Sequence, residues 1–367
     1  MKKKNFSQID CMKLSEISNN IAFEAFVKYH SLQHWYYLQL QEGQILLESE
    51  KKSWIVNELK RINQQNLLLW TEWQKIDKLA SEKKINLFLF KGIALSKQLY
   101  DDAFLRSTRD IDIFVDFNDW YIAEDIFLTL GYKRVKPNFE LNDVQLKQIK
   151  NHLHHFSYYH SVKKVLIELH WQLFVPEMLM PQGAKIMFGK QNNDKHEGLI
   201  RYNPNVLLHY LMVHAAMHHW FKLVWLSDMD RLIRNNSIDW NEFNMLTSTF
   251  RDERMVNVSF ALLQEYFETP INKEIKLNKA EQKIYKIAQK SIENKDNFLI
   301  LKGVKRIKRA YFLSLFKKDW SYKWYCWYAP MTNLEDWKTL PLPNYLFGFY
   351  FVFRPFLWFY HNYLKKR

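Results

Sequence analysis

Two carboxylates stand at alternate positions in the run Arg-Asp-Ile-Asp-Ile-Phe-Val, at Asp110 and Asp112. The run predicts a β-strand over residues 111–115 that begins beside Asp110, and side chains two apart in a strand point to the same face. Ile111 and Ile113 then face a core, and the carboxylates face the other side. Because Mg²⁺ prefers oxygen ligands, the pattern predicts a magnesium site. A lone Asp-x-Asp also occurs on solvated surface strands, so the neighbouring elements must show whether this pair is a metal site.

The elements around these aspartates predict a small mixed sheet. A short apolar run at residues 87–90 ends in Lys91-Gly92, which is typical of a buried strand followed by a turn. A helix is expected over residues 119–130, with Gly131 as its C-terminal cap. The other expected elements are a helix over residues 93–100 and strands over residues 132–135, 155–160 and 165–171, the last two paired through a turn near residues 161–164.

Apolar residues recur at helical spacing before and after this sheet. Helices are expected through residues 1–80 and from about residue 205 onward, with one long apolar periodicity over residues 206–235. Residues 330–343 are expected to be an irregular connection. The predicted fold class is α+β, a small mixed-sheet domain embedded in a mostly helical protein. The expected parts are an N-terminal helical segment (1–84), a catalytic core (85–175), a C-terminal helical domain (176–330) and an aromatic, basic tail (331–367).

The composition is globular and strongly basic. The 53 basic and 39 acidic side chains give a formal net charge of +14, which favours anionic partners such as nucleotides, nucleic acid or an acidic membrane face, or else reflects a solvated surface. Only 8 glycines argue against a large Gly-rich dinucleotide fold. Cys11 and Cys326 are far apart, and the N-terminal region lacks the apolar core of a signal peptide. A reduced, cytoplasmic protein is therefore expected.

Residues 344–363 are the most aromatic stretch of the chain. Arg354-Pro355 interrupts it, and Lys365-Lys366-Arg367 follows it, so a membrane span is not expected. The stretch is expected either to pack on the protein or to lie at a membrane interface. The second option would make the protein peripheral to the inner face of the membrane.

Two more charged residues are candidates for the site. Glu168 interrupts the otherwise apolar strand over residues 165–171, where a buried acidic side chain costs free energy unless it has a partner. It is therefore expected to be a third carboxylate of the site rather than an edge-strand surface residue. Arg106 lies four residues before Asp110. It either reaches a phosphate or a carboxylate with two bonds, or forms a structural salt bridge to Asp101 or Asp102.

The histidines raise the question of zinc. His214 and His218 have the i, i+4 spacing of metal ligands on a helix, but the run His-Ala-Ala-Met-His lacks the Glu of the zinc-protease motif. Further histidines that could add ligands are His154, His155, His170 and His209. Since spacing alone does not fix their geometry, they are expected to be core or pocket-wall residues rather than zinc ligands.

Taken in order, these segments resemble the nucleotidyltransferase superfamily, the fold shared by DNA polymerase β and aminoglycoside nucleotidyltransferases. The narrower resemblance is to the bacterial family of uncharacterised nucleotidyltransferases, and it covers roughly residues 87–232. The matching segments are Lys91-Gly92-Ile93-Ala94-Leu95, Leu99-Tyr100, Arg106, Asp110-Ile111-Asp112-Ile113, Gly131-Tyr132, His154-His155, Glu168-Leu169-His170-Trp171, His214, His218, Trp225-Leu226 and Asp228.

The resemblance implies where the candidate residues lie and what they hold. The strand with Glu168 is implied to lie beside the strand with Asp110 and Asp112, and the three carboxylates are implied to hold two Mg²⁺ ions. One ion binds the triphosphate, and the other lowers the pKa of the attacking hydroxyl. The residues implied to line the cleft between the catalytic core and the helical domain are His170, His214 and Asp228.

The turn after the first strand departs from the superfamily. The usual turn is Gly-Ser or Gly-Gly, whereas this chain has Lys91-Gly92 and lacks the Ser that often contacts the nucleotide phosphates. Either Lys91 takes over that contact as a point charge, or the nucleotide lies differently. Lys91, Gly92 and Arg106 are the expected nucleotide-binding residues.

Two functions from different classes follow. The first is an enzyme that transfers a nucleoside monophosphate from an NTP such as ATP to an acceptor hydroxyl or phosphate and releases pyrophosphate. The acceptor, whether a peptide, a glycan or lipid carrier, a small molecule or a protein, stays open. The second is a non-catalytic module with the same fold that binds nucleic acid or a protein partner. Basic clusters at residues 302–309 and 317–318, with Tyr311 and Phe312 beside them, support it.

Overall fold

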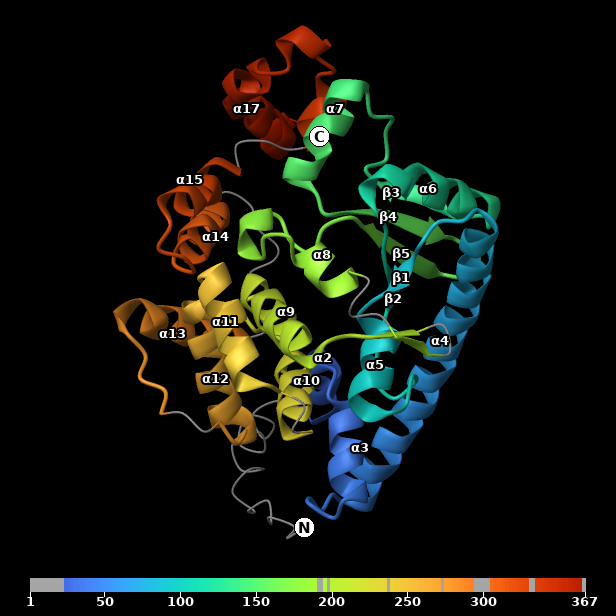
Figure 1. Cartoon of the computed structure of the whole chain (residues 1–367), viewed down its shortest axis with the longest axis vertical. Coiled ribbons are helices and arrows are strands. Elements are labelled where there is room, and N and C mark those ends of the chain that lie inside the picture. The colour runs from blue at the N-terminus through green and yellow to red at the C-terminus, as the bar shows by residue number, and fades with distance from the viewer. Residues whose placement is uncertain are drawn as a thin grey trace.

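The structure is a computed structural model that describes residues 23–189, 194–196, 199–235, 238–271, 274–293, 304–329 and 334–364. Its architecture is the one expected, a small mixed sheet within a mostly helical protein (Figure 1). The expected helices at residues 1–22 lie outside the described residues. The division into four parts stays a prediction.

The N-terminal helices frame one side of the sheet. They are α2 (Phe23–His30), α3 (Gln33–Gln41) and the 34-residue α4 (Ser49–Glu82), which runs along one edge of the molecule in Figure 1. The predicted apolar stripe of α4 is buried at Ile55, Leu59, Ile62 and Leu69. Asn66, buried on the same helix, donates to the carbonyls of Phe104 and Arg106 at 2.7 and 2.8 Å. This helix therefore fixes the loop that leads into the aspartate strand.

Five strands form the sheet in the order β1-β2-β5-β4-β3. They are β1 (Phe88–Leu89), β2 (Asp110–Phe114), β3 (Lys133–Lys136), β4 (His155–His160) and β5 (Val165–His170). The pairing of β2 with β5 is parallel, and the other pairings are antiparallel. Every strand expected from the sequence is present, and the pairing of β4 with β5 through residues 161–164 is confirmed.

The two faces of this sheet differ in character. Ile111 pairs with Ile167, and Ile167 pairs with Tyr158, so these three apolar side chains share one face. That face packs on α6 (Trp120–Thr129), where the rings of Phe127 and Tyr158 are 5.0 Å apart. The opposite face carries Asp112 and the other acidic side chains of β2 and β5. Alternation along each strand thus separates a core face from a polar face.

The remaining helices complete the protein. They are α5 (Gly92–Tyr100), α7 (Asp143–His152), α8 (Gly183–Phe188), α9 (Pro204–Met217), α10 (Leu223–Arg234), α11 (Trp240–Phe250), α12 (Glu253–Phe267), α13 (Lys279–Glu293), α14 (Val304–Ser314) and α15 (Trp320–Tyr328). A second, two-stranded sheet pairs β6 (Asp194–His196) with β7 (Leu199–Arg201). The apolar periodicity over residues 206–235 is divided between α9 and α10, because His219 and Trp220 adopt left-handed backbone angles between them.

One expectation about irregular structure was wrong, and one further helix was not predicted at all. Residues 330–343 contain a helix, α16 (Leu334–Thr339), whose Trp337 is buried against His152 at a ring distance of 5.5 Å. Helix α7 was not expected, although Asn142 and Gln145 form a capping box at its start. In both cases one contact or cap stabilises a helix too short for periodicity to reveal.

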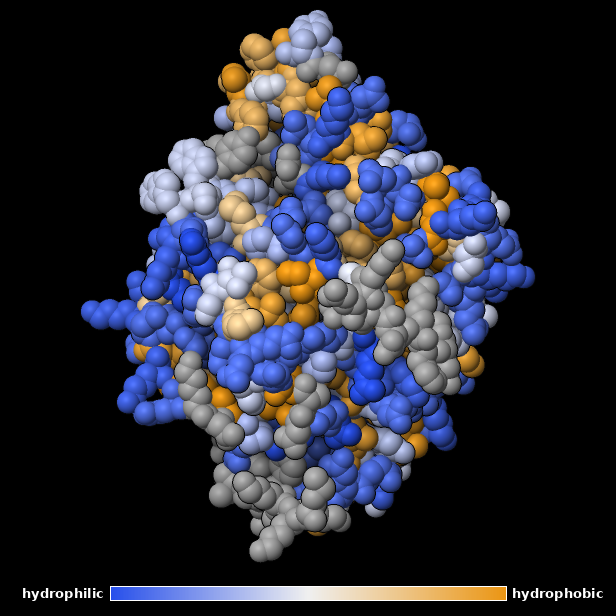
Figure 2. All heavy atoms as spheres, viewed as in Figure 1, coloured by the Kyte–Doolittle hydropathy of each residue, from blue (hydrophilic) through white to orange (hydrophobic). Residues whose placement is uncertain are grey.

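The aromatic tail packs one face on the protein and exposes the other. Its helix α17 (Phe349–Phe359) continues through Pro355, and Arg354 pairs with buried Asp336 at 2.7 Å. The exposed apolar face of α17 is defined by Phe349, Val352, Phe353, Phe356 and Phe359. In Figure 2, hydrophobic residues gather at the end of the molecule where Figure 1 labels α17. Among the described helices, none is long and apolar enough to cross a membrane.

Candidate active site

The parallel pairing of β2 with β5 places Asp112 directly opposite Glu168. Glu168 lies on a strand with neighbours on both sides, so it is not an edge-strand residue. His170, two residues further along β5, shares its face. Carboxylate oxygens of Asp112 and Glu168 and a ring nitrogen of His170 all lie within 4.8 Å of one another. The adjacency of the two strands, implied by the resemblance, is confirmed.

Asp110 adds a third carboxylate at the start of β2. Burial, together with the negative charges of Asp112 and Glu168, raises the pKa of Asp110 to about 7. Mutual repulsion of this kind is what a bound cation would relieve. Because the donors are carboxylate oxygens gathered on one face, this set fits Mg²⁺.

Asp112 is bonded to two groups. Its Oδ1 lies 3.0 Å from Nζ of Lys91 and 3.1 Å from Nε2 of His170. Burial alone would raise the pKa of Asp112, but Lys91 and His170 outweigh it and hold that pKa below its usual range. Burial likewise works against the charge on Lys91, and the carboxylate of Asp112 reverses the effect and raises the pKa of Lys91. Asp112 is therefore ionised, and Lys91 is protonated beside it.

The Lys91-Gly92 turn approaches the loop before β2 very closely. Gly92 has φ +41°, and a Cβ added there would lie 2.6 Å from Oγ1 of Thr108. Lys91 also adopts a positive φ of 63°. Only glycine fits at position 92, so the turn is built to bring α5 and Lys91 next to the aspartate strand.

Arg106 is bonded to a carboxylate, but to neither Asp101 nor Asp102. Its Nε lies 2.9 and 3.1 Å from the two carboxylate oxygens of Asp228 on α10, which is fully buried. The hydroxyl of Tyr100 also donates to Asp228, at 2.9 Å. The implied place of Asp228 on the cleft wall is corrected: it lies behind Arg106 and holds that side chain against the cleft.

A cavity of about 250 Å³ opens over the carboxylates. Its lining includes Asp110, Asp112, Glu168, Lys91, Gly92, Arg106, Arg109, Tyr210, His214, Lys222 and Trp225. His170 lies beneath this lining, bonded to Asp112. Four cationic side chains thus surround three carboxylates, an arrangement that suits a metal ion together with an anionic ligand.

Sequence reasoning missed several residues of this lining, among them Tyr210 and Lys222. Tyr210 stands one helical turn before His214 on α9, and this i, i+4 pair on an apolar helix was the available signal. Lys222 immediately precedes α10 and carried no signal. Burial, followed by the charges of Arg109 and Arg106, lowers the pKa of Lys222 to about 8.

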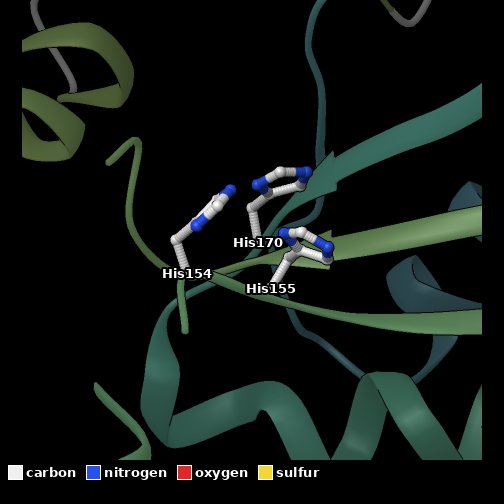
Figure 3. Close-up of side chains that lie close together, drawn as sticks. All are labelled: His154, His155 and His170. Atoms are coloured by element: carbon white, nitrogen blue, oxygen red, sulfur yellow. The ribbon is translucent and has the colours of Figure 1, made fainter. Parts of the chain in front are cut away.

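Five of the six candidate histidines form two separate groups, and the sixth, His209, lies 3.3 Å from Asp252. The rings of His214 and His218 are 4.8 Å apart and lie against Trp225, and among the described residues neither belongs to a group of three possible metal ligands. His154, His155 and His170 do form such a group, shown in Figure 3. Burial lowers the pKa of His155 to about 2 and that of His154 well below its usual value, so both rings are neutral.

The basic clusters are less accessible than their sequence indicated. Lys317 is buried, pairs with Asp252 at 2.9 Å and donates to the carbonyl of Phe250. Phe312 is buried as well, whereas Lys318 and Tyr311 are exposed. Residues 302–303 of the other cluster lie outside the described residues. Lys317 and Phe312 cannot contact nucleic acid, because the folded chain already surrounds them.

A family model described as "Uncharacterised nucleotidyltransferase" matches residues 22–268. No curated protein and no solved structure matches the chain. The matched span contains every candidate residue of the cavity.

Proposed function

The chain belongs to the uncharacterised nucleotidyltransferase family, and we propose on that premise that it is a magnesium-dependent nucleotidyltransferase related to DNA polymerase β. The observation that carries the proposal is the facing pair of Asp112 and Glu168 on parallel strands, with Asp110 beside them. Three carboxylates on one sheet face, open to a cationic cavity, match the needs of transfer from a nucleoside triphosphate.

Asp110, Asp112 and Glu168 would hold the metal, with two Mg²⁺ ions as the proposed number. When bound, Mg²⁺ neutralises charge on the phosphoryl group and lowers the pKa of the attacking hydroxyl. The chain itself holds these carboxylates in place through the β2–β5 ladder and the bond from His170 to Asp112. Such preorganised positioning accounts for most of the protein's work in phosphoryl chemistry.

The cations around the cavity bind the triphosphate. Lys91, at the start of α5, exchanges its bond to Asp112 for a phosphate oxygen, and the N-terminus of that helix favours negative charge. Lys222 and Arg109 add positive charge from the other walls. Arg106, fixed by Asp228, supplies a rigid charge. These residues take the place of the absent serine of the usual turn.

The reaction joins the acceptor to the α-phosphorus. An acceptor oxygen forms a new bond to that phosphorus while the bond to the β-phosphate oxygen breaks. A hydroxyl acceptor loses its proton to solvent, a phosphate acceptor attacks through an ionised oxygen, and pyrophosphate leaves in either case. The acceptor can be a peptide, a glycan or lipid carrier, a small molecule or a protein, and ATP is the first nucleotide to test.

The proposal includes a cytoplasmic location with a peripheral membrane contact. The exposed apolar face of α17 carries four phenylalanines, and the basic residues Lys365, Lys366 and Arg367 follow that helix in the sequence. Aromatic rings with neighbouring basic charge suit the interface of an anionic membrane. An acceptor on a lipid carrier would be presented at the same surface.

The second candidate function is binding without catalysis. The exposed side chains of Lys318 and Tyr311 favour it, but the burial of Lys317 and Phe312 removes half of that support. Three carboxylates gathered in one cavity have no use in a module that binds only a polyanion, because they repel such a ligand. Catalysis is therefore the function we put to the test first.

The test uses purified wild type, the Asp110→Asn/Asp112→Asn double variant and a matched control, Asp101→Asn/Asp125→Asn, in which both aspartates are exposed. Each NTP is titrated by calorimetry with and without Mg²⁺, and pyrophosphate release is assayed with cell extract as acceptor. We expect Mg²⁺-dependent binding and pyrophosphate release in wild type and control only. Full activity in the double variant would overturn the metal assignment, and absence of NTP binding in wild type would favour the binding module.

A further inference from the structure

Three imidazoles converge beside the carboxylates, at the ends of β4 and β5. His155 pairs with His170 across the antiparallel strands, and the carbonyl of His154 accepts a bond from the backbone of Trp171 at 3.0 Å. The ring centroids are 4.5 Å apart for His154 and His155, 4.8 Å for His155 and His170, and 5.4 Å for His154 and His170. Figure 3 shows the three rings turned toward a common centre. The two strands thus hold three ring nitrogens within 4.8 Å of one another.

Two of these rings have a buried nitrogen without a partner. Nδ1 of His155 and Nδ1 of His170 have no hydrogen-bond partner among the described residues. The ring of His170 is 1% exposed, so bulk water cannot supply the hydrogen bond that its Nδ1 lacks. Buried polar atoms normally find a partner, and exceptions in a native structure require an explanation. A shared ligand at the centre of the cluster would satisfy both nitrogens at once.

The other nitrogens of the same rings face carboxylates. Nε2 of His170 lies 3.1 Å from Asp112 and 3.4 Å from Glu168, and Nε2 of His155 lies 3.6 Å from Glu168. A carboxylate that accepts the proton of Nε2 leaves the lone pair on Nδ1. Metal-binding histidines are commonly oriented in this way, with the second ring nitrogen donating to a carboxylate.

We propose that His154, His155 and His170 bind a divalent transition metal ion, with Zn²⁺ as the expected ion, next to the Mg²⁺ carboxylates. Nδ1 of His155 and Nδ1 of His170 are two of the ligand atoms, and His154 supplies the third. Neutral imidazole suits Zn²⁺ and its neighbours in the first transition row. Zinc–nitrogen bonds of about 2.0–2.1 Å would draw the three nitrogens to roughly 3.3 Å from one another.

The site is distinct from the proposed magnesium site in its chemistry. Mg²⁺ prefers carboxylate and water oxygens, so it competes poorly for three nitrogens. The two sites are linked through His170, because its bond to Asp112 orients a carboxylate of the magnesium site. The histidine site does not rest on the proposed catalytic function, and it persists in a protein without turnover.

The test measures metal binding and not activity. Full-length protein is stripped with chelator and titrated with Co²⁺ in the presence of millimolar Mg²⁺, and the Co²⁺ absorption bands and the bound metal content are recorded. The same is done with Zn²⁺ by competition. The variants are His154→Asn and His155→Asn. One matched control is His160→Asn at the other end of β4, and a second is Asp110→Asn, which alters the carboxylate site alone.

We expect wild type, His160→Asn and Asp110→Asn to retain one Co²⁺ per chain, displaced by Zn²⁺. His154→Asn and His155→Asn should each weaken Co²⁺ binding more than tenfold, because loss of even an outer-shell partner costs about 10–100-fold. Circular dichroism shows whether each variant is folded. Both positions are half-buried, and His154→Asn is the safer of the two because His154 lies just before β4 and not within it.

Three results would overturn the site. They are loss of Co²⁺ from wild type in millimolar Mg²⁺, wild-type affinity in both folded histidine variants, and loss of Co²⁺ in Asp110→Asn with retention in His154→Asn. The last result would assign the metal to the carboxylates. Absence of NTP turnover with Co²⁺ still held by the histidines would reject the proposed function and leave this site standing.

Discussion

Arg106 and Asp228 are joined in a buried ion pair across 122 residues of sequence. Three contacts of 2.9–3.1 Å connect the guanidinium to the two carboxylate oxygens. The pair ties α10 to the loop that precedes β2, and Tyr100 donates to the same carboxylate. The position of Arg106 in the cavity wall therefore depends on the carboxylate of Asp228, which comes from the helical part of the chain.

The ion pair makes a prediction about stability. Asp228→Ala leaves Arg106 buried without its anion, which should lower the free energy of unfolding by about 3–5 kcal/mol. The double variant Arg106→Met/Asp228→Leu should recover most of that loss, since both charges are gone. Urea unfolding followed by circular dichroism measures both. A double variant as unstable as Asp228→Ala would mean that packing, and not the unpaired charge, is at fault.

The bond between Lys91 and Asp112 predicts opposite effects on nucleotide and metal. Lys91→Met should raise KM for the NTP by about 10–100-fold, because a charged hydrogen bond contributes about 1.5–3 kcal/mol. The same change should lower the Mg²⁺ concentration needed for half-maximal rate, since Nζ of Lys91 no longer competes for Oδ1 of Asp112. Steady-state kinetics at varied NTP and Mg²⁺ give both constants. Lys97→Met is the control, because Lys97 lies within α5 and pairs with exposed Asp101. A higher Mg²⁺ requirement in Lys91→Met would contradict the competition.

A buried histidine outside the cavity lining, His34, predicts the pH dependence of stability. Burial, aided by the charge of Arg106, lowers the pKa of His34 to about 3. The unfolded chain binds a proton there near pH 6.5 and the folded chain does not. This contribution to stability is therefore complete above about pH 6.5 and is lost as the pH falls toward 3.

The test compares wild type with His34→Gln, whose amide can still donate to the hydroxyl of Tyr100. Between pH 5 and 6 the unfolding free energy of the variant should change less steeply with pH than that of wild type. The two slopes should differ by about 1 kcal/mol per pH unit. Other titrating groups are common to both proteins and cancel. Above pH 8 the two slopes should coincide, which is the internal control. Equal slopes at acidic pH would show that His34 is protonated in the folded protein.

The exposed apolar face of α17 makes a prediction about membranes. Phe356 is 72% exposed and Phe349 is 47% exposed. Phe349→Ser/Phe356→Ser should weaken binding to anionic phospholipid vesicles by about tenfold or more per ring, because burial of a phenylalanine contributes about 1.5–3 kcal/mol. Vesicle co-sedimentation measures the partition. Leu128→Ser/Met245→Ser, two exposed apolar residues on other helices, is the control, and an equal loss there would remove any special role of α17.

The sequence by itself determined the local parts of the site. Alternation of Asp110, Ile111, Asp112 and Ile113 predicts a strand with one acidic and one apolar face, since side-chain direction in a strand depends only on neighbouring residues. Gly92 and Gly131 marked the turns for a similar reason: φ is positive at both positions. These patterns extend over a few residues, so a single chain is enough to recognise them.

The tertiary structure decided which distant residues meet. Sequence patterns marked Glu168 as a candidate, but the parallel register placed it opposite Asp112. Asp228 had a place on the cleft wall by resemblance alone, and the fold put it behind Arg106 instead. The burial of Lys317 and the convergence of His154, His155 and His170 were likewise decided by the fold, because both depend on how distant elements pack together. Contacts of this kind arise when remote segments fold together, and local spacing does not encode them.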